Sequence, residues 1–268
     1  LTLAAGKLIR TGTGDIRAAA GGNIVLGADT SVIYTAGRLA DSLSGFVAPA
    51  WSSPSAVPNF AQFSQDGGDV SLVALGDIIG ATSKQLINNW LFRQGSLNAD
   101  GTAYVKQPAW WVRFDQFRQG VGALGGGDVS LKAAGRIENL SASAPTQGRM
   151  ASGTPDAGAL AVSGGGTVQV EAGGDVLGGI YYADRGDVIL KTAGQVASAG
   201  QLDSDGQPVY TILALGDGTA QVHARGDVDI HAVFNPTLFD QSSSLSSSTA
   251  KSVFNVTNNS GRDSVFST

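Results

Sequence analysis

An eleven-residue pattern, repeated six times, constrains the fold of this chain more than any other feature. One copy, "GDVSLKAAGRI", starts at Gly127, and four of the six copies open with the dipeptide Gly-Asp. A pattern kept through many copies indicates one structural unit that is built repeatedly. The six copies start at Gly14, Gly68, Gly127, Gly166, Gly186 and Gly218.

Within each copy, small or aliphatic residues alternate with polar ones, which is typical of a strand with one buried face. In the copy from Gly127, Val129 and Leu131 would face the interior, whereas Ser130 and Lys132 would face water. An aliphatic residue follows two positions after a ninth-position Gly. A fixed Gly between two short strands marks a corner that needs positive φ or close backbone approach. The ninth-position glycines are Gly22, Gly76, Gly135, Gly174, Gly194 and Gly226.

The spacing of the copies predicts a β-solenoid. The copies from Gly166 and Gly186 lie only 20 residues apart, and a strand, a corner and a second strand within such a period are typical of one coil. Equivalent positions of successive coils would then stack about 4.8 Å apart. The segment "LTLAAGKLI" (residues 1–9) fits as a seventh copy if one residue is dropped. A β-sandwich or barrel with similar strands is the alternative, and the "GGxGxD" repeat of calcium-binding solenoids is absent.

Composition narrows the class of protein. The 268 residues include 38 Gly, carry a net charge of −5 and contain no Cys. With so few basic residues the chain offers no stripe for a phosphate backbone, so we expect no nucleic-acid partner. No apolar run approaches the ~18 residues of a membrane-spanning helix. We expect no cofactor and no metal site, and the opening in mid-pattern suggests a fragment of a longer chain.

The Gly-Asp-Val coils resemble the filamentous haemagglutinin family, long adhesins and exoproteins that Gram-negative bacteria export by two-partner secretion. Further similarity lies in "LIRTGTGDIRAAAGGNIVLGADTSVIYTAGR" (Leu8–Arg38), "NNWLFRQG" (Asn88–Gly95) and "WWVRFDQFRQGVGALGGGDV" (Trp110–Val129). These look like the C-terminal haemagglutinin-like region of a subset of such exoproteins. The resemblance implies a right-handed parallel β-helix, export through an outer-membrane transporter, and secretion or location on the outer cell surface. The family's secretion domain is not visible in this chain.

We predict a single β-helix segment over residues 1–268 with three long insertions, at about residues 28–65, 81–124 and 141–165, and a Ser-rich stretch at 241–250. The first insertion includes an extra strand, "SVIYTAG". The second is predicted to contain a short helix that has Ser83 as its N-cap and ends before Gly95. The third is rich in Ala, Ser, Gly and Pro and is predicted to be a loop without chemistry.

The second insertion carries a candidate aromatic recognition loop. Its large rings are interleaved with Lys106, Arg113 and Arg118, and aromatics beside Arg can stack on sugars or on a partner protein. The alternative is that the rings pack the insertion onto the flank of the β-helix, because exposed rings in such number would promote aggregation. The residues are Trp90, Tyr104, Trp110, Trp111, Phe114 and Phe117.

Two Arg-Gly-Asp tripeptides are candidate adhesion motifs of the kind that animal cell-adhesion receptors bind. In both, the Gly-Asp part belongs to the repeated pattern, and the position before that Gly varies freely among the copies. Coil construction therefore explains the tripeptides more simply than selection for a receptor. The residues are Arg185, Gly186 and Asp187 in the first, and Arg225, Gly226 and Asp227 in the second.

Right-handed β-helices also include polysaccharide lyases and hydrolases, which cluster carboxylates with basic residues on one outward face. Here the recurrent outward carboxylates occupy one turn position, where Asp more often bonds its own backbone. These are Asp15, Asp69, Asp128 and Asp187. Neither His223 nor His231 completes a Ser-His-Asp set. We therefore expect an adhesive stem that binds host-cell or matrix proteins, glycans or neighbouring copies, with a purely structural spacer as the alternative and no enzymatic activity.

Overall fold

The repeated pattern forms one continuous parallel sheet, which we call sheet C. The computed structural model describes residues 1–40, 48, 50–51, 59–100, 102–150, 160–236 and 251–252. Each of the six copies supplies one strand, and equivalent positions pair in register, such as Val129 with Val168. The strands are β3 (Ile16–Ala20), β10 (Val70–Ala74), β15 (Val129–Ala133), β20 (Val168–Ala172), β23 (Val188–Thr192) and β26 (Ala220–Ala224).

The short strands that follow the Gly corners form a second parallel sheet, sheet A. Its strands are β1 (Thr2–Leu3), β4 (Ile24–Leu26), β11 (Ile78–Ile79), β16 (Ile137–Glu138), β21 (Val176–Leu177) and β24 (Val196–Ala197). The prediction that residues 1–9 form a seventh copy of the pattern is wrong, because β1 pairs with β4 in sheet A and β2 pairs with β5 in sheet B.

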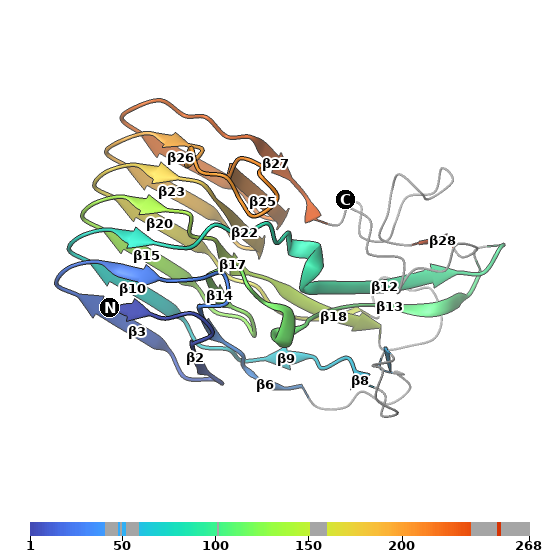
Figure 1. Cartoon of the computed structure of the whole chain (residues 1–268). Coiled ribbons are helices and arrows are strands. Elements are labelled where there is room, and N and C mark those ends of the chain that lie inside the picture. The colour runs from blue at the N-terminus through green and yellow to red at the C-terminus, as the bar shows by residue number, and fades with distance from the viewer. Residues whose placement is uncertain are drawn as a thin grey trace.

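A third parallel sheet, sheet B, closes each pass of the chain. Its strands are β2 (Leu8–Thr11), β5 (Val32–Thr35), β14 (Val121–Ala123), β17 (Ala142–Ala144), β22 (Gly179–Arg185), β25 (Thr211–Asp217) and β27 (Ala232–Phe234). The chain visits sheets C, A and B in turn, and we call one such pass a coil (Figure 1). The predicted strand "SVIYTAG" is β5. It belongs to a coil, as do β14 and β17, so the three inserted segments are shorter than predicted.

The side chains between the three sheets form the first core. The predicted alternation is confirmed, because Val129, Leu131 and Ala133 are buried while Lys132 is exposed. Burying one such aliphatic side chain contributes roughly 1.5–3 kcal/mol. This all-β arrangement of long parallel sheets is compatible with the predicted solenoid.

Close approach between coils, and not positive φ, explains the ninth-position Gly where the preceding coil carries Asn or Asp at the next position, as at Gly76, Gly135 and Gly194. None of the six has φ in the left-handed region. A Cβ added at Gly135 would lie 2.0 Å from Oδ1 of Asp77 in the preceding coil. That oxygen accepts a hydrogen bond from the Arg136 N–H at 2.9 Å. The Asp77 carboxylate therefore fits at this corner because the residue opposite it in the next coil, Gly135, has no side chain.

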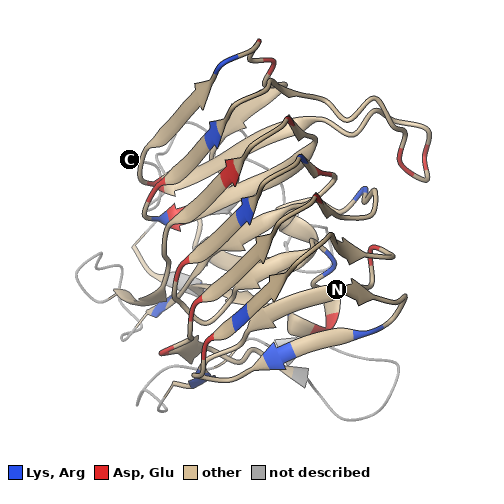
Figure 2. Ribbon diagram, turned by 90° about the vertical axis from the view of Figure 1, so that its left-hand side faces the viewer, with Lys and Arg blue, Asp and Glu red and all other residues tan. Residues whose placement is uncertain are grey.

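The Asp residues of the pattern form a ladder at another corner. Asp69 Oδ1 accepts the Asp128 N–H at 2.8 Å, and Asp128 Oδ1 accepts the Thr167 N–H at 2.7 Å. Asp15 bonds Asp69 in the same way, at 3.0 Å. Figure 2 shows acidic residues in rows where the strands meet the corners. Each carboxylate thus bonds the backbone of the next coil, and not that of its own turn as predicted.

Removing one Asp of the ladder should slightly weaken the stacking of the coils. Asp128→Ala deletes the acceptor of the Thr167 N–H and is expected to lower the free energy of unfolding by about 1 kcal/mol. Asp128→Asn keeps an oxygen in place, as Asn23 does naturally for the Asp77 N–H. Its stability should stay near wild type in urea denaturation. Equal losses in the two variants would show that the carboxylate charge, rather than the hydrogen bond, stabilises this corner.

The second and third insertions build an antiparallel lateral sheet that extends from the flank of the stack (Figure 1). Its strands are β12 (Leu91–Leu97), β13 (Tyr104–Val112), β18 (Thr146–Met150), β19 (Leu160–Gly164) and β28 (Lys251–Ser252). The third insertion was predicted to be a loop, but it contributes β18 and β19 to this sheet. Residues 151–159 lie outside the described residues. The Ser-rich stretch 241–250 also lies outside them.

The predicted helix from Ser83 to Gly95 is wrong. One turn of 3-10 helix, η1 (Ile87–Asn89), precedes β12, whose Leu91 pairs with Val112. The Ser83 hydroxyl accepts the Gln85 N–H at 3.2 Å, a local turn that caps no α-helix. A second 3-10 turn, η2 (Phe114–Gln116), follows β13. Within the first insertion, β6 (Arg38–Leu39) pairs with β9 (Ser64–Gln65), and β7 (Ala50–Trp51) pairs with β8 (Asn59–Phe60).

Candidate functional site

Much of the outward face of sheet B is apolar, and the second insertion covers that part. Tyr34 and Tyr182 point away from the first core and pack against rings of the insertion. Trp90 meets Phe117 edge-on with ring centroids 5.1 Å apart, and it lies 6.4 Å from Tyr182. This second core fixes the insertion to the stack.

The candidate aromatic residues therefore divide into two groups. Trp90, Trp111 and Phe117 are buried, so their rings contact protein and are not open to a ligand. Trp110 is half-buried and donates from Nε1 to the Thr146 hydroxyl at 2.9 Å, and Phe114 is also half-buried. Tyr104 pairs with Leu97 in the lateral sheet, and its side chain lies outside the described part of the structure. Packing on the flank thus accounts for most of these rings.

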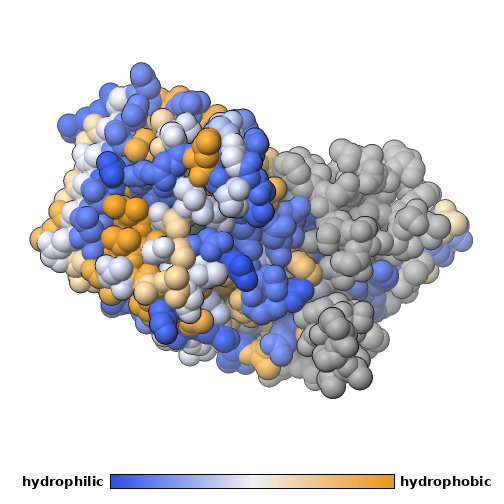
Figure 3. Space-filling view, in the orientation of Figure 1, coloured by the Kyte–Doolittle hydropathy of each residue, from blue (hydrophilic) through white to orange (hydrophobic). Residues whose placement is uncertain are grey.

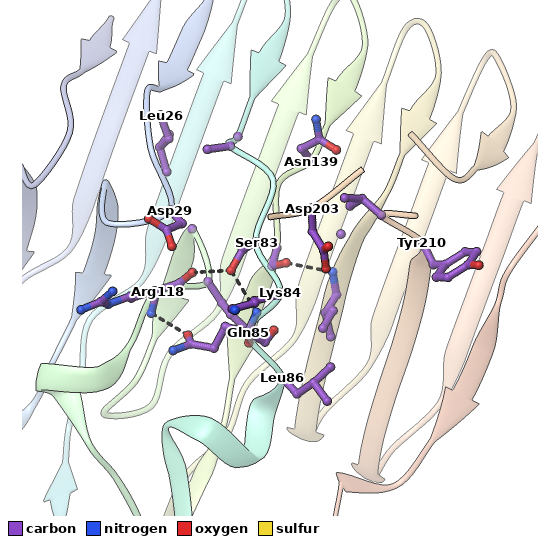
Figure 4. A pocket seen from close by; sticks show the side chains of 18 of the residues that line it. Leu26, Asp29, Ser83, Lys84, Gln85, Leu86, Arg118, Asn139, Asp203 and Tyr210 are labelled. Carbon is purple, nitrogen blue, oxygen red and sulfur yellow. Dashed lines mark hydrogen bonds between the residues drawn. The ribbon is translucent and has the colours of Figure 1, made fainter. Parts of the chain in front are cut away.

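A small pocket of about 170 Å³ lies beside this covered face (Figure 4). The Gln85 side chain accepts the Arg118 N–H at 2.7 Å, and the Gln119 side chain accepts Trp90 Nε1 at 2.7 Å. Lys84 forms an ion pair with Asp205 at 2.9 Å, and this contact raises the pKa of the Lys84 ammonium. These polar groups bond one another, so the pocket anchors the insertion.

A larger groove of about 930 Å³ lies between the first strands of sheet B and the second insertion. Its floor is the outward face of β2 and β5, which contributes Leu8, Arg10 and Tyr34. The segment 111–118 forms one wall, and Phe60 with Gln62 of the first insertion completes the lining. We consider this groove the candidate functional site because it combines cations, rings and exposed apolar groups.

Arg10 is held over the rings of the groove. Its guanidinium carbon lies 5.6 Å from the ring centroid of Tyr34 and 5.5 Å from that of Phe114. The two rings stack on each other with centroids 5.9 Å apart. Such contacts orient a guanidinium while leaving donors at its edge free for a ligand. Burial raises the pKa of the Tyr34 hydroxyl, although the Arg10 charge opposes the shift.

One carboxylate lies in the groove, and a neighbouring arginine neutralises it. Asp115 accepts hydrogen bonds from Arg113 at 2.6 and 3.2 Å and from Gln116 at 3.0 Å. Burial raises the pKa of the Asp115 carboxyl, but these hydrogen bonds outweigh it and lower the pKa overall. Arg10, Arg113 and Arg118 with Asp115 give the groove a net charge of +2, opposite in sign to that of the whole chain.

Two large apolar side chains in the groove face solvent. Leu8 is 54% exposed and Phe60 is 56% exposed. Elsewhere, hydrophobic residues on the face drawn in Figure 3 lie in small patches between hydrophilic ones. Exposed apolar groups beside fixed cations are typical of a surface that contacts a partner.

The first Arg-Gly-Asp tripeptide forms part of the ladder. Asp187 Oδ1 accepts the Thr219 N–H at 3.0 Å and the Thr219 hydroxyl at 2.6 Å, which lowers the pKa of the Asp187 carboxyl. Gly186 has φ +114°, and a Cβ there would lie 2.6 Å from the Gly166 carbonyl oxygen. The fold thus requires Gly at position 186, and the Asp187 carboxylate bonds the next coil.

The second tripeptide is exposed at a corner of the last coil. The Gly226 N–H donates to the Gly194 carbonyl at 2.8 Å, and the Arg225 N–H donates to the Thr192 carbonyl at 3.2 Å. The side chain of Asp227 faces solvent. Receptor binding by either tripeptide stays a prediction, and neither contributes to the groove.

Sequence reasoning found Phe114, Arg113 and Arg118 but missed Arg10 and Phe60. Arg10 precedes the first copy of the pattern, and only the stacking of β2 on β5 sets it opposite the second insertion. Its register partner is Tyr34. The one sequence signal for Arg10 was its place directly after two consecutive apolar residues, Leu8 and Ile9, which suggest a strand.

Among the described residues, no helix is long and apolar enough to cross a membrane, and no group of side chains is suited to hold a metal ion. Comparison with protein-family models, curated proteins and solved structures finds no match to this chain.

Proposed function

We propose that this chain is an attachment segment of a large bacterial exoprotein that resembles the filamentous haemagglutinin family. In this proposal the three parallel sheets are a right-handed parallel β-helix that serves as a rigid stem. The protein is exported through an outer-membrane transporter of the two-partner type and acts outside the cell or on the outer surface of a Gram-negative bacterium. The groove between sheet B and the second insertion is its recognition surface.

The charge of the groove carries this proposal. A net charge of +2 gathers in one hollow of a chain whose net charge is −5. Fixed charges of one sign in a concave surface attract partners of the opposite sign and speed their association. The stem supports this function because interlocked coils hold β2 and β5 in place under the groove.

The groove favours binding over catalysis. Hydrolysis of a glycoside ordinarily requires two carboxyl groups, one on each side of the scissile bond. Among the described residues that line the groove, Asp115 is the one carboxylate, and it is bonded to Arg113. A spacer without any recognition surface is the remaining alternative, and nothing in a spacer would call for clustered arginines.

Reversing the charge of the groove should weaken attachment strongly. We expect cells to attach to surfaces coated with the wild-type protein, and attachment to fall about tenfold with the Arg10→Glu/Arg118→Glu variant, because its groove would repel anionic partners. Arg17→Glu is the matched control. Arg17 is exposed on sheet C, away from the groove, and pairs only locally with Asp15 at 2.9 Å.

Two results would contradict the proposal. Wild-type protein that holds no more cells than an inert blocking protein would favour the spacer. Attachment that falls as much with Arg17→Glu as with the groove variant would show a general charge effect and remove the groove from the account.

A further inference from the structure

We infer that the groove binds an acidic segment of a partner protein, an extended peptide in which carboxylates alternate with apolar side chains. This inference rests on the proposed function and names the partner class of the same site. Three features of the groove lead to it: the cations Arg10 and Arg118, the exposed apolar groups, and the covered faces of most of its rings.

The cations call for carboxylates. Among the described residues no carboxylate forms an ion pair with Arg10 or Arg118. In Figure 4 the Arg118 side chain extends away from Ser83 and Gln85, the residues that bond its backbone. Arg10 is oriented by the rings beneath it. A guanidinium held in this way loses little conformational freedom when it forms a two-pronged contact with a carboxylate.

The apolar groups call for hydrophobic side chains between those carboxylates. Leu8 lies two residues before Arg10 on β2, so both side chains point outward from the same face. Phe60 adds an exposed ring to the same groove. An apolar and a cationic side chain two residues apart on one strand of the floor suit an extended peptide that carries both acidic and apolar residues.

The rings argue for a peptide over a sugar. A pyranose stacks on the open face of an aromatic ring. Here Tyr34 and Phe114 stack on each other, and Arg10 lies over both. Trp111 and Phe117 are buried, so Phe60 is the one exposed ring among the described residues of the groove. Arginine and aromatic residues without lysine are, moreover, the composition typical of protein interfaces.

A direct test measures binding of a fluorescein-labelled peptide of sequence Glu-Leu-Glu-Phe-Glu-Leu-Glu by fluorescence anisotropy. We expect the full chain to bind it, and the Kd to rise about tenfold in Arg10→Ala and in Arg118→Ala. Leu8→Ser should also weaken binding, while Arg17→Ala should leave the Kd unchanged. A peptide with Lys in place of every Glu should not bind, and added salt should raise the Kd.

Equal Kd values for wild type and Arg10→Ala would overturn the inference, as would preference for the lysine peptide. The inference would also be overturned if an oligouronate, used as an anionic sugar probe, bound through Arg10 and the peptide did not bind. That last result would leave the proposed attachment function intact. The opposite result is also informative: the peptide binds through Arg10, but cells attach equally well to wild type and to Arg10→Glu/Arg118→Glu. In that case the groove binds an acidic peptide, and the proposed attachment function is wrong.

Discussion

Val188→Asp is expected to abolish cooperative folding of the chain. Val188 is fully buried in the first core and pairs in sheet C with Val168 on one side and Ala220 on the other. Among the described residues the first core consists of hydrophobic side chains, so a carboxylate placed there would have no cation to pair with. Burying an unpaired charge costs several kcal/mol, comparable to the whole stability of a typical domain, about 5–15 kcal/mol.

Urea denaturation followed by circular dichroism measures this effect, and Lys191→Ser is the matched control. Lys191 lies on the same strand with its side chain exposed, so its replacement should change the free energy of unfolding by less than about 0.5 kcal/mol. If the two variants were equally stable, the assignment of inward and outward faces in β23 would be wrong.

Trp90→Ala should release the second insertion from sheet B. Trp90 is fully buried, contacts Phe117 and Tyr182, and donates from Nε1 to Gln119 at 2.7 Å. Truncating a buried Trp to Ala typically costs about 3–5 kcal/mol, and here the Gln119 oxygen would also lose its donor. We expect a lower unfolding midpoint and new proteolytic cleavage between residues 91 and 120.

Leu86→Ala controls for a change in the same segment, because Leu86 is 46% exposed. Its effect on stability and on the rate of cleavage should be small. Should Trp90→Ala resist protease as well as Leu86→Ala does, the second core would not be what holds the insertion to the stack.

The alternation of residues predicted sheet C well. Burial at Val129, Leu131 and Ala133 is a property of period two within one strand, so local sequence contains it. The ninth-position Gly likewise predicted the corners. Its cause, however, is the Asp77 carboxylate of the preceding coil, which local sequence does not place beside Gly135.

The middle of sheet B could not be predicted from alternation, because both faces of β5, β14, β17 and most of β22 are buried. Val32, Ile33 and Tyr34 are consecutive apolar residues, and Ile180, Tyr181 and Tyr182 repeat this pattern. Such runs indicate strands covered on both sides. The repeated pattern ends before them, so they were assigned to insertions or left without a sheet.

The helix was predicted from Leu86, Ile87, Trp90 and Leu91, whose spacing suits one face of a helix. Periodicity cannot separate a short helix from a strand when the apolar run is this brief. Pairing of Leu91 with Val112 and of Phe92 with Trp111 decided the outcome, since β13 supplies backbone partners that a helix would not use.

The groove depends on contacts between segments far apart in the sequence. The pattern of aromatics and arginines predicted Phe114 and Arg113 as candidates, but their partners Arg10 and Tyr34 come from the first two coils. Only the stacking of coils and the docking of the insertion bring them together. Sheet C and its Gly corners were therefore predictable from local pattern, whereas sheet B, the lateral sheet and the groove depend on contacts between distant segments.

Cell attachment to coated surfaces, compared between two double variants, distinguishes recognition by the groove from recognition by the tripeptides. One variant is Arg10→Glu/Arg118→Glu in the groove, and the other is Asp187→Glu/Asp227→Glu in the two Arg-Gly-Asp tripeptides. We predict that attachment falls about tenfold with the first variant and is kept with the second. Loss with the tripeptide variant, together with full attachment to the groove variant, would contradict this prediction.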